Sequence, residues 1–226
     1  MKKEEQKKGK GLIIIIEILC VVAFLYAGFQ LFTIFQDYQR ASDEYDALSD
    51  ELVIETFEET EEIEETSILD LPYDYEVPFY QVDLAKARSI NKDTVGWIIL
   101  PDSKINYPIV KSKDNTEYLT TTFEGQTANS GAIFIDMYCA ADFSSENTII
   151  YGHNMKNGRM FRALNFMTDK EYFWRHHIFC IDMGNGFENY EVISCYETVE
   201  TDYSSWQISF ESKEMYESWL QKIVKR

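Results

Sequence analysis

The sequence has few glycines, prolines, histidines and cysteines: ten, four, three and four, respectively, in 226 residues. So little glycine and proline excludes a collagen-like or low-complexity chain. Basic residues are also in the minority, with 21 Lys and Arg against 39 Asp and Glu, which gives a formal net charge of −18. Because a protein without a basic face cannot displace counterions from phosphates, we expect no nucleic-acid partner.

The few cysteines do not form the pattern of a disulfide-bonded protein. They are Cys20, Cys139, Cys180 and Cys195. Cys20 lies in a long apolar segment, and the three that remain are an odd and sparse set, whereas a disulfide framework is normally even and dense. Cys180 and Cys195 lie in apolar stretches and are predicted to be small core residues. Cys139 lies in a predicted loop, where we expect it to be exposed.

Long apolar runs are also rare, and the exception is at the N-terminus. Residues 12–35 are almost entirely apolar, interrupted by Glu17 and Gln30. A helix of this length, at about 1.5 Å per residue, spans a hydrocarbon core of about 30 Å. A cleaved signal peptide is the alternative, but the run is longer than a normal signal core and no Ala-x-Ala site follows it. Cys20 raises the possibility of a lipoprotein signal, which the bulky Leu19 before it disfavours.

Charge asymmetry around this segment predicts its orientation and the domain organisation. Five lysines precede it, so residues 1–11 are predicted to be cytoplasmic, residues 12–35 a transmembrane signal-anchor, and the remainder extracellular. Residues 36–70 are predicted to be an acidic linker that begins with a helix, because residues 41–70 hold thirteen Asp and Glu and no Lys or Arg. In the acidic run 55–65, which follows the helix, like charges repel and solvate. A solvated spacer is the favoured interpretation, and binding of divalent ions is the alternative.

Residues 71–226 have the composition and length of one globular domain. Apolar, β-branched runs predict a mostly antiparallel β domain with two inserted helices. The predicted strands are 95–100, 105–110, 132–135, 148–151, 178–181 and 190–196, with residues 118–123 as a connector. The predicted helices are 83–90, which packs on the domain, and 160–177 and 210–225, which are the inserted pair.

His153 is the candidate catalytic residue. It follows the apolar run 148–151 and Gly152, and a polar turn with glycine at position 158 comes next. A histidine at the end of a buried strand is held in place and yet accessible, and imidazole titrates near neutral pH, as general acid–base catalysis requires. From these residues alone, a hydrogen-bonded structural histidine remains the alternative.

Several segments in the same order resemble class B sortases, which are membrane-anchored cysteine transpeptidases of Gram-positive bacteria. They are Val-Gly-Trp-Ile (95–98), Gly-Ala-Ile-Phe-Ile-Asp (131–136), Asn-Thr-Ile-Ile-Tyr-Gly-His-Asn-Met (147–155) and Gly-Arg-Met-Phe-Arg-Ala-Leu (158–164). The resemblance implies a sortase-like β-barrel of eight strands and assigns the catalytic role to His153. It also implies cleavage of a C-terminal sorting signal in a secreted protein, whose new end is joined to an amine of a peptidoglycan precursor or a pilin. No cofactor or metal is implied.

The nucleophile and the catalytic arginine of the family do not map onto this sequence. In the family the cysteine lies in a Thr-Leu-x-Thr-Cys strand far downstream and the arginine lies on the next strand, whereas this sequence stops at Arg226. We therefore expect the closing strands of the barrel to be missing and the chain as written to be inactive. Cys195 is an alternative nucleophile, but it lacks the Thr-Leu-x-Thr context. Three arginines after His153 match no family position and are expected to be solvated helix residues: Arg159, Arg162 and Arg175.

His176 and His177 raise the possibility of a metal site. Adjacent side chains on a helix point about 100° apart, so they rarely bind one ion, and no further ligands follow at metal-binding spacing. We interpret the pair as residues at a helix C-terminus, where cations are favoured.

Three hypotheses follow from the sequence. The chain is a class B sortase whose recorded sequence stops early, a sortase-like binding module tethered to the membrane without a nucleophile, or an unrelated envelope protein in which His153 is structural. Agreement among several ordered motifs disfavours the third.

Overall fold

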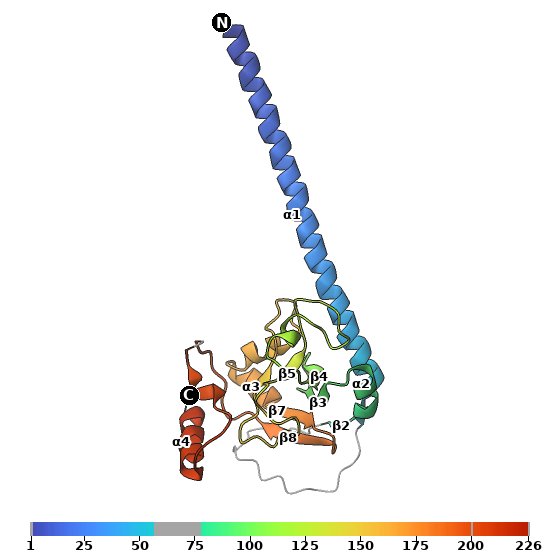
Figure 1. Ribbon diagram of the computed structural model, residues 1–226, viewed down its shortest axis with the longest axis vertical. Helices are drawn as coiled ribbons and strands as arrows, with labels where there is room; N and C mark the ends of the chain where they lie inside the picture. The colour runs from blue at the N-terminus through green and yellow to red at the C-terminus, as the bar shows by residue number, and fades with distance from the viewer. Residues whose placement is uncertain (1, 57–77, 200, 226) are drawn as a thin grey trace. The chain divides into compact units, whose positions relative to one another are not determined.

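The structure of the protein is a computed structural model that describes residues 2–56, 78–199 and 201–225 (Figure 1). It divides into two compact units, Met1–Arg40 and Ala41–Arg226. Residues 57–77, which include most of the acidic run 55–65 and the first residues of the predicted domain, lie outside the described residues.

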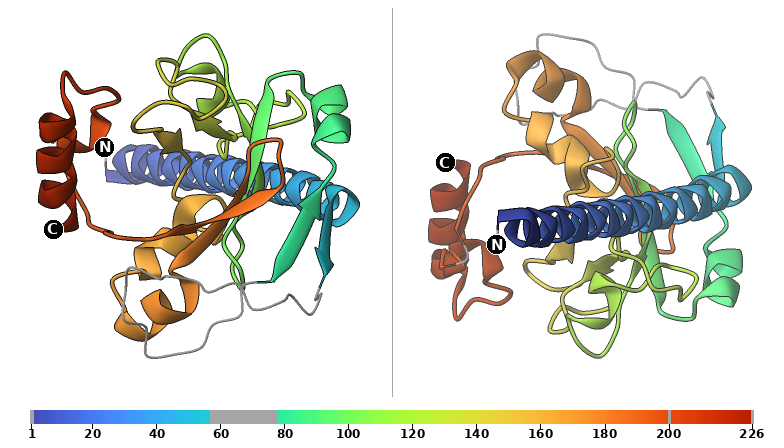
Figure 2. Two further views of the ribbon diagram at one scale, coloured as in Figure 1. Left: turned by 90° about the horizontal axis from the view of Figure 1, so that it is seen from below. Right: turned by 90° about the horizontal axis from the view of Figure 1, so that it is seen from above.

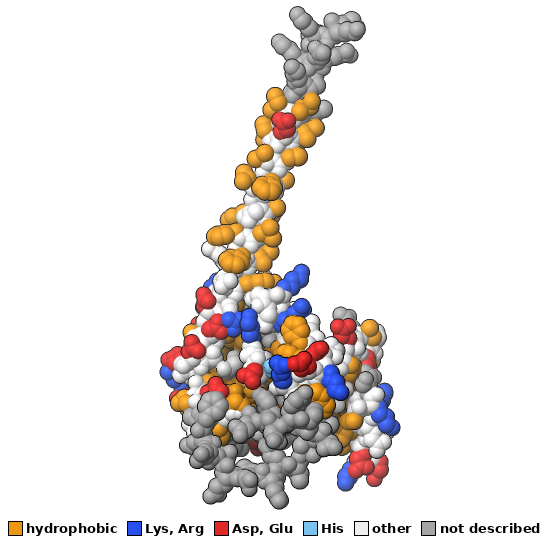
Figure 3. Space-filling view, turned by 180° about the vertical axis from the view of Figure 1, so that it is seen from behind, with side chains coloured by type: hydrophobic (Ala, Val, Ile, Leu, Met, Phe, Trp, Pro, Cys, Tyr) orange, Lys and Arg blue, Asp and Glu red, His pale blue; other side chains and the backbone are white. Residues whose placement is uncertain are grey.

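The first unit is the N-terminal part of helix α1 (Lys2–Leu52). All large hydrophobic side chains from Ile13 to Phe35 are exposed, and they cover the helix on the face shown in Figure 3. A helix that is apolar all round and has no protein neighbours is typical of a membrane span. By length and composition, α1 can cross a membrane. The structure thus confirms the predicted apolar helix.

The second unit begins with the last turns of the same helix. Ala41, Tyr45, Leu48 and Leu52 recur at intervals of four, three and four residues and are only 2–3% exposed. That spacing places them on one face of the helix, which packs against the domain. The globular unit therefore includes residues 41–52 of the stretch that the sequence analysis placed in a linker.

A six-stranded sheet forms the centre of the globular unit, in the order β6-β5-β4-β3-β7-β8. All its pairs are antiparallel except β4–β5, which is parallel. Its strands are β3 (Thr94–Ile99), β4 (Asn106–Val110), β5 (Ile133–Ile135), β6 (Ile150–Tyr151), β7 (Ile178–Asp182) and β8 (Phe187–Glu191). Two further strands, β1 (Val53–Thr56) and β2 (Phe79–Val82), form a separate antiparallel pair. The mostly β prediction with inserted helices is confirmed, and the sheet is curled like half of a barrel.

The core lies around the middle strands. Trp97 on β3, Ile109 on β4 and Ile133 on β5 are fully buried. Continuous apolar runs such as Trp97 to Leu100 are buried on both faces of the sheet, as expected for central strands. The Trp97 Nε1 donates to Asn106 Oδ1 at 2.6 Å, so its one polar group is satisfied.

Short helices connect the strands. They are α2 (Leu84–Ile90), the 3-10 helices η1 (Glu117–Leu119), η2 (Phe161–Phe166) and η3 (Tyr203–Trp206), α3 (Lys170–His176) and α4 (Lys213–Val224). Side-chain oxygens cap the N-termini of α2, α3 and α4: Asp83 accepts from Lys86 N, Asp169 from Tyr172 N and Ser212 from Met215 N. Each capping oxygen satisfies a donor that has no partner inside its helix.

Two predicted elements are wrong in extent. The predicted helix 160–177 is interrupted, because Met160 has a positive φ of 54° and Asp169 starts a separate helix, α3. The predicted strand 190–196 is β8, which ends at Glu191. That residue pairs with Ile178, the first residue of β7. Val192 N still donates to His177 O at 2.7 Å, and residues 193–196 then belong to no strand.

The C-terminal part of the chain, residues 203–225, forms a small lobe of η3 and α4. In both views of Figure 2 it lies at the edge of the globular unit away from α2. Phe210, Tyr216 and Trp219 form a local aromatic cluster, with ring centroids 5.1–5.9 Å apart. No residue of α4 is fully buried. Apart from the Tyr151–Trp206 ring contact, the lobe is attached mainly through residues 146 and 147, whose side chains bond Phe210 N and Gln207 O at 2.8 Å.

Candidate active site

The sheet positions His153 through β6 and a glycine. Strand β6 pairs with β5 at the edge of the sheet, and Gly152 follows it. A Cβ at Gly152 would lie 2.5 Å from Ile133 Cδ1 and 2.7 Å from Phe161 Cδ2, so only glycine allows this close packing. The backbone immediately before His153 is therefore held against the core.

Backbone contacts join the two ends of the loop that follows His153. Phe161 N donates to His153 O at 2.9 Å, and Asn154 pairs with Met160 in an isolated antiparallel bridge. Met160 is fully buried although its φ of 54° and ψ of −135° are unfavourable for a non-glycine residue. Such strain persists only where the surroundings fix the backbone, often at functional sites. Here Met160 N donates to the Tyr107 hydroxyl at 3.0 Å.

The imidazole of His153 is half-buried. Burial lowers its pKa below the usual value for histidine, because desolvation disfavours the charged ring. Among the described residues, no side chain forms a hydrogen bond or an ion pair with this ring. A neutral, partly accessible imidazole at neutral pH can accept a proton from one group and deliver it to another.

A buried carboxylate supports the strand before His153. Asp136, 5% exposed, accepts hydrogen bonds from the Tyr151 hydroxyl at 2.8 Å and from Asn115 Nδ2 at 2.7 Å. Burial and the adjacent carboxylate raise the pKa of Tyr151, so its hydroxyl stays protonated and donates. The ammonium of Lys111 donates to the carbonyl oxygens of residues 136, 137 and 139 at 2.7–3.0 Å. Together these contacts fix the loop that follows β5.

Two predictions about the cysteines are wrong. Cys139 was expected to be exposed, but it is 3% exposed because its loop folds inward, and its Sγ accepts from Ile149 N at 3.4 Å. Cys195 was expected in the core, but it is exposed because its segment has left the sheet. Cys180 is buried as predicted. All four cysteines, including Cys20, are free thiols.

Two of these thiols, Cys180 and Cys195, lie in environments that disfavour the thiolate. Burial raises the pKa of Cys180 to about 12, and partial desolvation raises the pKa of Cys195. The Cys195 thiol lies against Leu164 O at 3.7 Å. A reactive cysteine needs a lowered pKa from a nearby cation or a helix N-terminus. The Cys180 and Cys195 thiols have the opposite environment.

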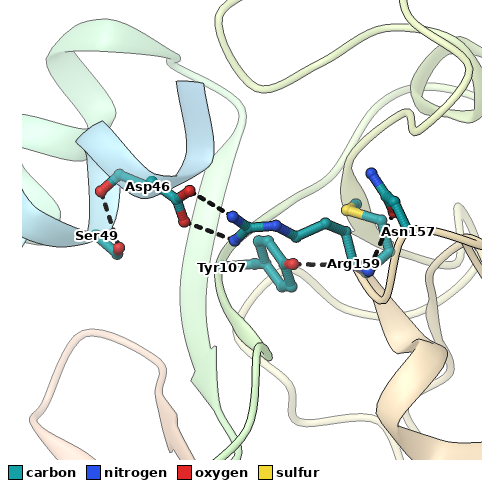
Figure 4. A network of polar contacts seen from close by, with 6 residues as sticks. Asp46, Ser49, Tyr107, Asn157 and Arg159 are labelled. Atoms are coloured by element: carbon teal, nitrogen blue, oxygen red, sulfur yellow. Dashed lines mark hydrogen bonds and ion pairs between the residues drawn. The ribbon is translucent and has the colours of Figure 1, made fainter. Parts of the chain in front are cut away.

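The three arginines after His153 have different environments. Arg159 was predicted to be a solvated helix residue, which is wrong: it precedes η2 and forms a two-pronged ion pair with Asp46 of α1 (Figure 4). Arg162 Nη1 donates to Asn154 Oδ1 at 3.1 Å, beside His153. Arg175 is solvated as predicted and pairs with Glu171 one turn away.

His176 and His177 lie at the end of α3, as the sequence predicted. Their Nδ1 atoms contact the carbonyl oxygens of Tyr172 at 2.8 Å and of Trp174 at 3.0 Å, and the His176 ring stacks on Tyr172 with centroids 3.9 Å apart. In the described part of the chain, no group of three His, Cys, Asp or Glu side chains is arranged to hold a metal ion.

Sequence reasoning singled out His153 as the candidate residue but missed the residues that hold the loop around it. Asp46 and Tyr107 lie 113 and 53 residues before their respective partners, Arg159 and Met160. No local pattern connects residues so far apart. The helical spacing of the apolar residues 41, 45, 48 and 52 was the available signal that this part of α1 packs on a domain.

Two sortases are similar to this chain in sequence. Sortase B of Listeria monocytogenes is 40% identical over 143 residues, which make up 62% of this chain and 57% of that protein. Sortase B of Staphylococcus aureus is 32% identical over 139 residues, which again make up 62% of this chain and 57% of that protein. The chain thus matches less than two thirds of the length of either relative. No family profile matches the chain.

Solved structures of the same family have the same fold. The crystal structure of sortase B from Bacillus anthracis in complex with AAEK1 has a TM-score of 0.66 and 31% sequence identity to this chain. That match covers 85% of this chain and 82% of the solved chain. Identity at this level over most of both chains, together with the shared sheet, shows common descent. The protein therefore belongs to the class B sortase family.

Proposed function

We propose that this protein is a membrane-anchored cysteine transpeptidase of the sortase type in which His153 is the acid–base residue. The observation that carries the proposal is the position of the His153 imidazole, which is half-buried, neutral and carried just after β6 by a backbone held against the core. Membership of the class B sortases supplies the class of reaction.

In the proposed reaction a cysteine thiolate attacks the carbonyl carbon of a peptide bond in a sorting signal. His153 carries the proton of the thiol and delivers it to the leaving amine as the tetrahedral intermediate collapses to a thioester. An acceptor amine then attacks the thioester, His153 takes one proton from it, and the thiol is released. The neutral ring suits both directions of transfer because its free nitrogen can accept a proton at neutral pH.

The nucleophile is proposed not to be any of the cysteines in the globular unit. Cys139 and Cys180 are buried, and the pKa of the Cys195 thiol is raised rather than lowered. We therefore expect residues 1–226 by themselves to form no thioester with a sorting-signal peptide. They would supply the acid–base part of the site.

The proposed substrates are secreted proteins that carry a C-terminal sorting signal, and the proposed acceptors are amines of a peptidoglycan precursor or a pilin. The apolar part of α1 would anchor the protein in the cell membrane. Lysines before that segment and acidic residues after it favour a cytoplasmic N-terminus and an extracellular domain.

A chimera tests the proposal. The Cys- and Arg-bearing strands that the family resemblance implies are placed after Arg226, and cleavage of sorting-signal peptides is followed with an amine acceptor present. We expect transpeptidation that His153→Ala abolishes and Cys195→Ala leaves unchanged. Mass spectrometry of the 226-residue chain with the same peptides should show no adduct, and a substrate adduct on Cys195 would make that residue the nucleophile instead.

A second candidate is a membrane-tethered module that binds sorting signals without covalent chemistry. The environment of the described cysteines favours it, because the Cys180 and Cys195 thiols are not activated. Saturable binding of a sorting-signal peptide to the 226-residue chain, together with an inactive chimera, would support this candidate over the transpeptidase.

A further inference from the structure

The last turns of α1 are anchored to the globular unit by specific polar contacts. The Tyr45 hydroxyl donates to Gly131 O at 2.7 Å and accepts from Phe123 N at 3.2 Å. Glu44 Oε1 accepts from Glu124 N at 2.9 Å, and Glu51 pairs with Lys86 at 2.5 Å. These contacts fix the rotation of the helix about its axis, so that Asp46 is held on a defined side.

Asp46 meets Arg159 in a two-pronged arrangement. Both terminal nitrogens of the guanidinium donate to the two carboxylate oxygens, Nη1 to Oδ1 at 2.6 Å and Nη2 to Oδ2 (Figure 4). The Arg159 side chain is 21% exposed and that of Asp46 is 51% exposed. A planar fork on a carboxylate fixes orientation as well as distance. This pair can therefore set the position of the backbone that carries Arg159.

That backbone leads directly to His153. Met160 follows Arg159, has a positive φ, and donates its amide hydrogen to the Tyr107 hydroxyl. The Tyr107 ring in turn packs edge-on against Tyr45 of α1, with centroids 5.1 Å apart. Met160 then pairs with Asn154, and Phe161 N donates to His153 O. The contacts from Asp46 to His153 are therefore continuous. Asp46, through Arg159, and Tyr45, through Tyr107, both support the loop 154–161.

We propose that Asp46 is a positioning residue for His153: through its ion pair with Arg159, the last turns of α1 hold the loop 154–161 in its strained conformation and so fix the catalytic histidine. The catalytic part of this statement rests on the proposed function of His153. The segment 41–52 is then part of the active-site support as well as the continuation of a membrane anchor.

A second ion pair in the chain provides a matched comparison. Glu171 and Arg175 form an Arg–carboxylate pair one turn apart on α3, with side chains 72% and 64% exposed. Exposed pairs of this kind contribute little to stability. Asp46 and Arg159 instead join two segments distant in sequence at a loop with a strained backbone. Asp46→Asn and Glu171→Gln each remove one carboxylate charge, but only Asp46→Asn is expected to change the pKa of His153.

The test is an NMR titration of the full 226-residue chain in detergent micelles. The chain has three histidines, so the His153 ring signals are assigned with His153→Ala, and His176 and His177 serve as internal references. In Asp46→Asn we expect the His153 pKa to rise toward the usual histidine value, because a loosened loop admits water to the ring. The Met160 and Phe161 amides should exchange about tenfold faster, a change of about 1.4 kcal/mol in local opening.

Three further variants keep the test decisive. Asp46→Glu retains a carboxylate and should restore slow hydrogen exchange at the Met160 and Phe161 amides. The double variant Asp46→Arg with Arg159→Asp swaps the two charges and should restore slow hydrogen exchange partly. Glu171→Gln should leave the His153 titration and both amides unchanged. If Asp46→Asn lowers thermal stability but leaves His153 and the two amides as in the parent chain, the pair is merely structural and the proposal is wrong.

These readouts do not depend on catalysis. If the chimera described above retains activity in His153→Ala, the acid–base role fails while the loop-positioning result still stands. If instead His153 proves essential, and Asp46→Asn changes neither the titration of His153 nor the kcat of the chimera, the positioning role fails while the proposed function stands.

Discussion

The β3–β4–β5 region and the C-terminal lobe belong to the same compact unit, but their packing differs. In the first region, Trp97, Ile109 and Ile133 are fully buried, and the last turns of α1 pack against the domain. In the lobe, Tyr203 is 73% and Trp206 48% exposed, and no residue of α4 is fully buried. Free energy of folding scales with apolar area removed from water. Stability should therefore reside in residues 41–182, which also carry His153.

The largest expected difference between the two regions concerns tryptophan. Trp97→Ala should lower the free energy of unfolding by about 3–5 kcal/mol, because it leaves a cavity among fully buried neighbours and removes the bond to Asn106. Trp206→Ala, at a half-exposed position of the lobe, should cost less than about 1 kcal/mol. Urea unfolding of the full chain in micelles, followed by circular dichroism, measures both. Equal losses would mean that the lobe is as well packed as the sheet.

The anchoring of α1 should have the next largest effect. Tyr45→Phe removes the donor to Gly131 O and the acceptor of Phe123 N, and leaves two buried backbone groups unsatisfied, at a cost of about 1–3 kcal/mol. Tyr203→Phe, at an exposed position of the lobe, should be neutral in the same unfolding measurement. A neutral result for Tyr45→Phe would show that residues 41–52 contribute to the domain through apolar contacts alone.

A smaller effect is expected within the lobe. Trp219→Ala disrupts the aromatic cluster with Phe210 and Tyr216, and removes the hydrogen bond of the indole to Ser204 O. Because the lobe has few contacts with the sheet, it should open locally. Hydrogen exchange should show loss of protection in α4 with unchanged protection in β3 and β4, and global unfolding should change by less than about 1 kcal/mol. Simultaneous loss in β3 would indicate one cooperative unit.

The smallest effect is a pH dependence from His153. Burial lowers its folded pKa, so between the folded and the unfolded pKa the unfolded state binds more protons. Its stabilising contribution is full above the unfolded value of about 6.5 and is lost as pH falls through that value toward the folded pKa. Unfolding of His153→Gln from pH 7.5 to 5 should therefore depend less on pH than that of the parent. An identical pH dependence would mean that the ring is fully hydrated in the folded protein.

From the sequence, most strands of the densely packed β3–β4–β5 region could be predicted, whereas the loops and the segment leading to the C-terminal lobe were predicted less well. Apolar, β-branched runs identified β3, β4, β5 and β7, because burial on two faces leaves a continuous signal in the chain. The predicted helix 160–177 failed because helical spacing of apolar residues says nothing of the positive φ at Met160, which tertiary contacts with Tyr107 support. The predicted strand 190–196 failed because a strand needs a partner, and partners are not local.

For the candidate site, the sequence indicated His153, which stays a prediction, and did not indicate the residues that support its loop. Gly152 and His153 are adjacent and follow a strand, so a short window contains the signal. Cys139 was misjudged because a loop composition does not reveal that Lys111 draws the backbone around it inward. Asp46 was placed in the helix that begins the predicted acidic linker, because charge density is a local property, whereas its pairing with Arg159 depends on how α1 packs on the domain.

The parallel pairing of β4 with β5 has a consequence for the order of folding. Strands β3 and β4 are joined by a short turn and can pair early, but a parallel neighbour requires a crossover, here residues 111–132. Closing that longer loop costs chain entropy before any contact compensates for it, and such non-local pairing is slow. Among the described strands β6 pairs with β5 alone. We therefore expect the His153 loop to form late, after the crossover has closed, and a folding intermediate with only β3–β4 paired to lack the site.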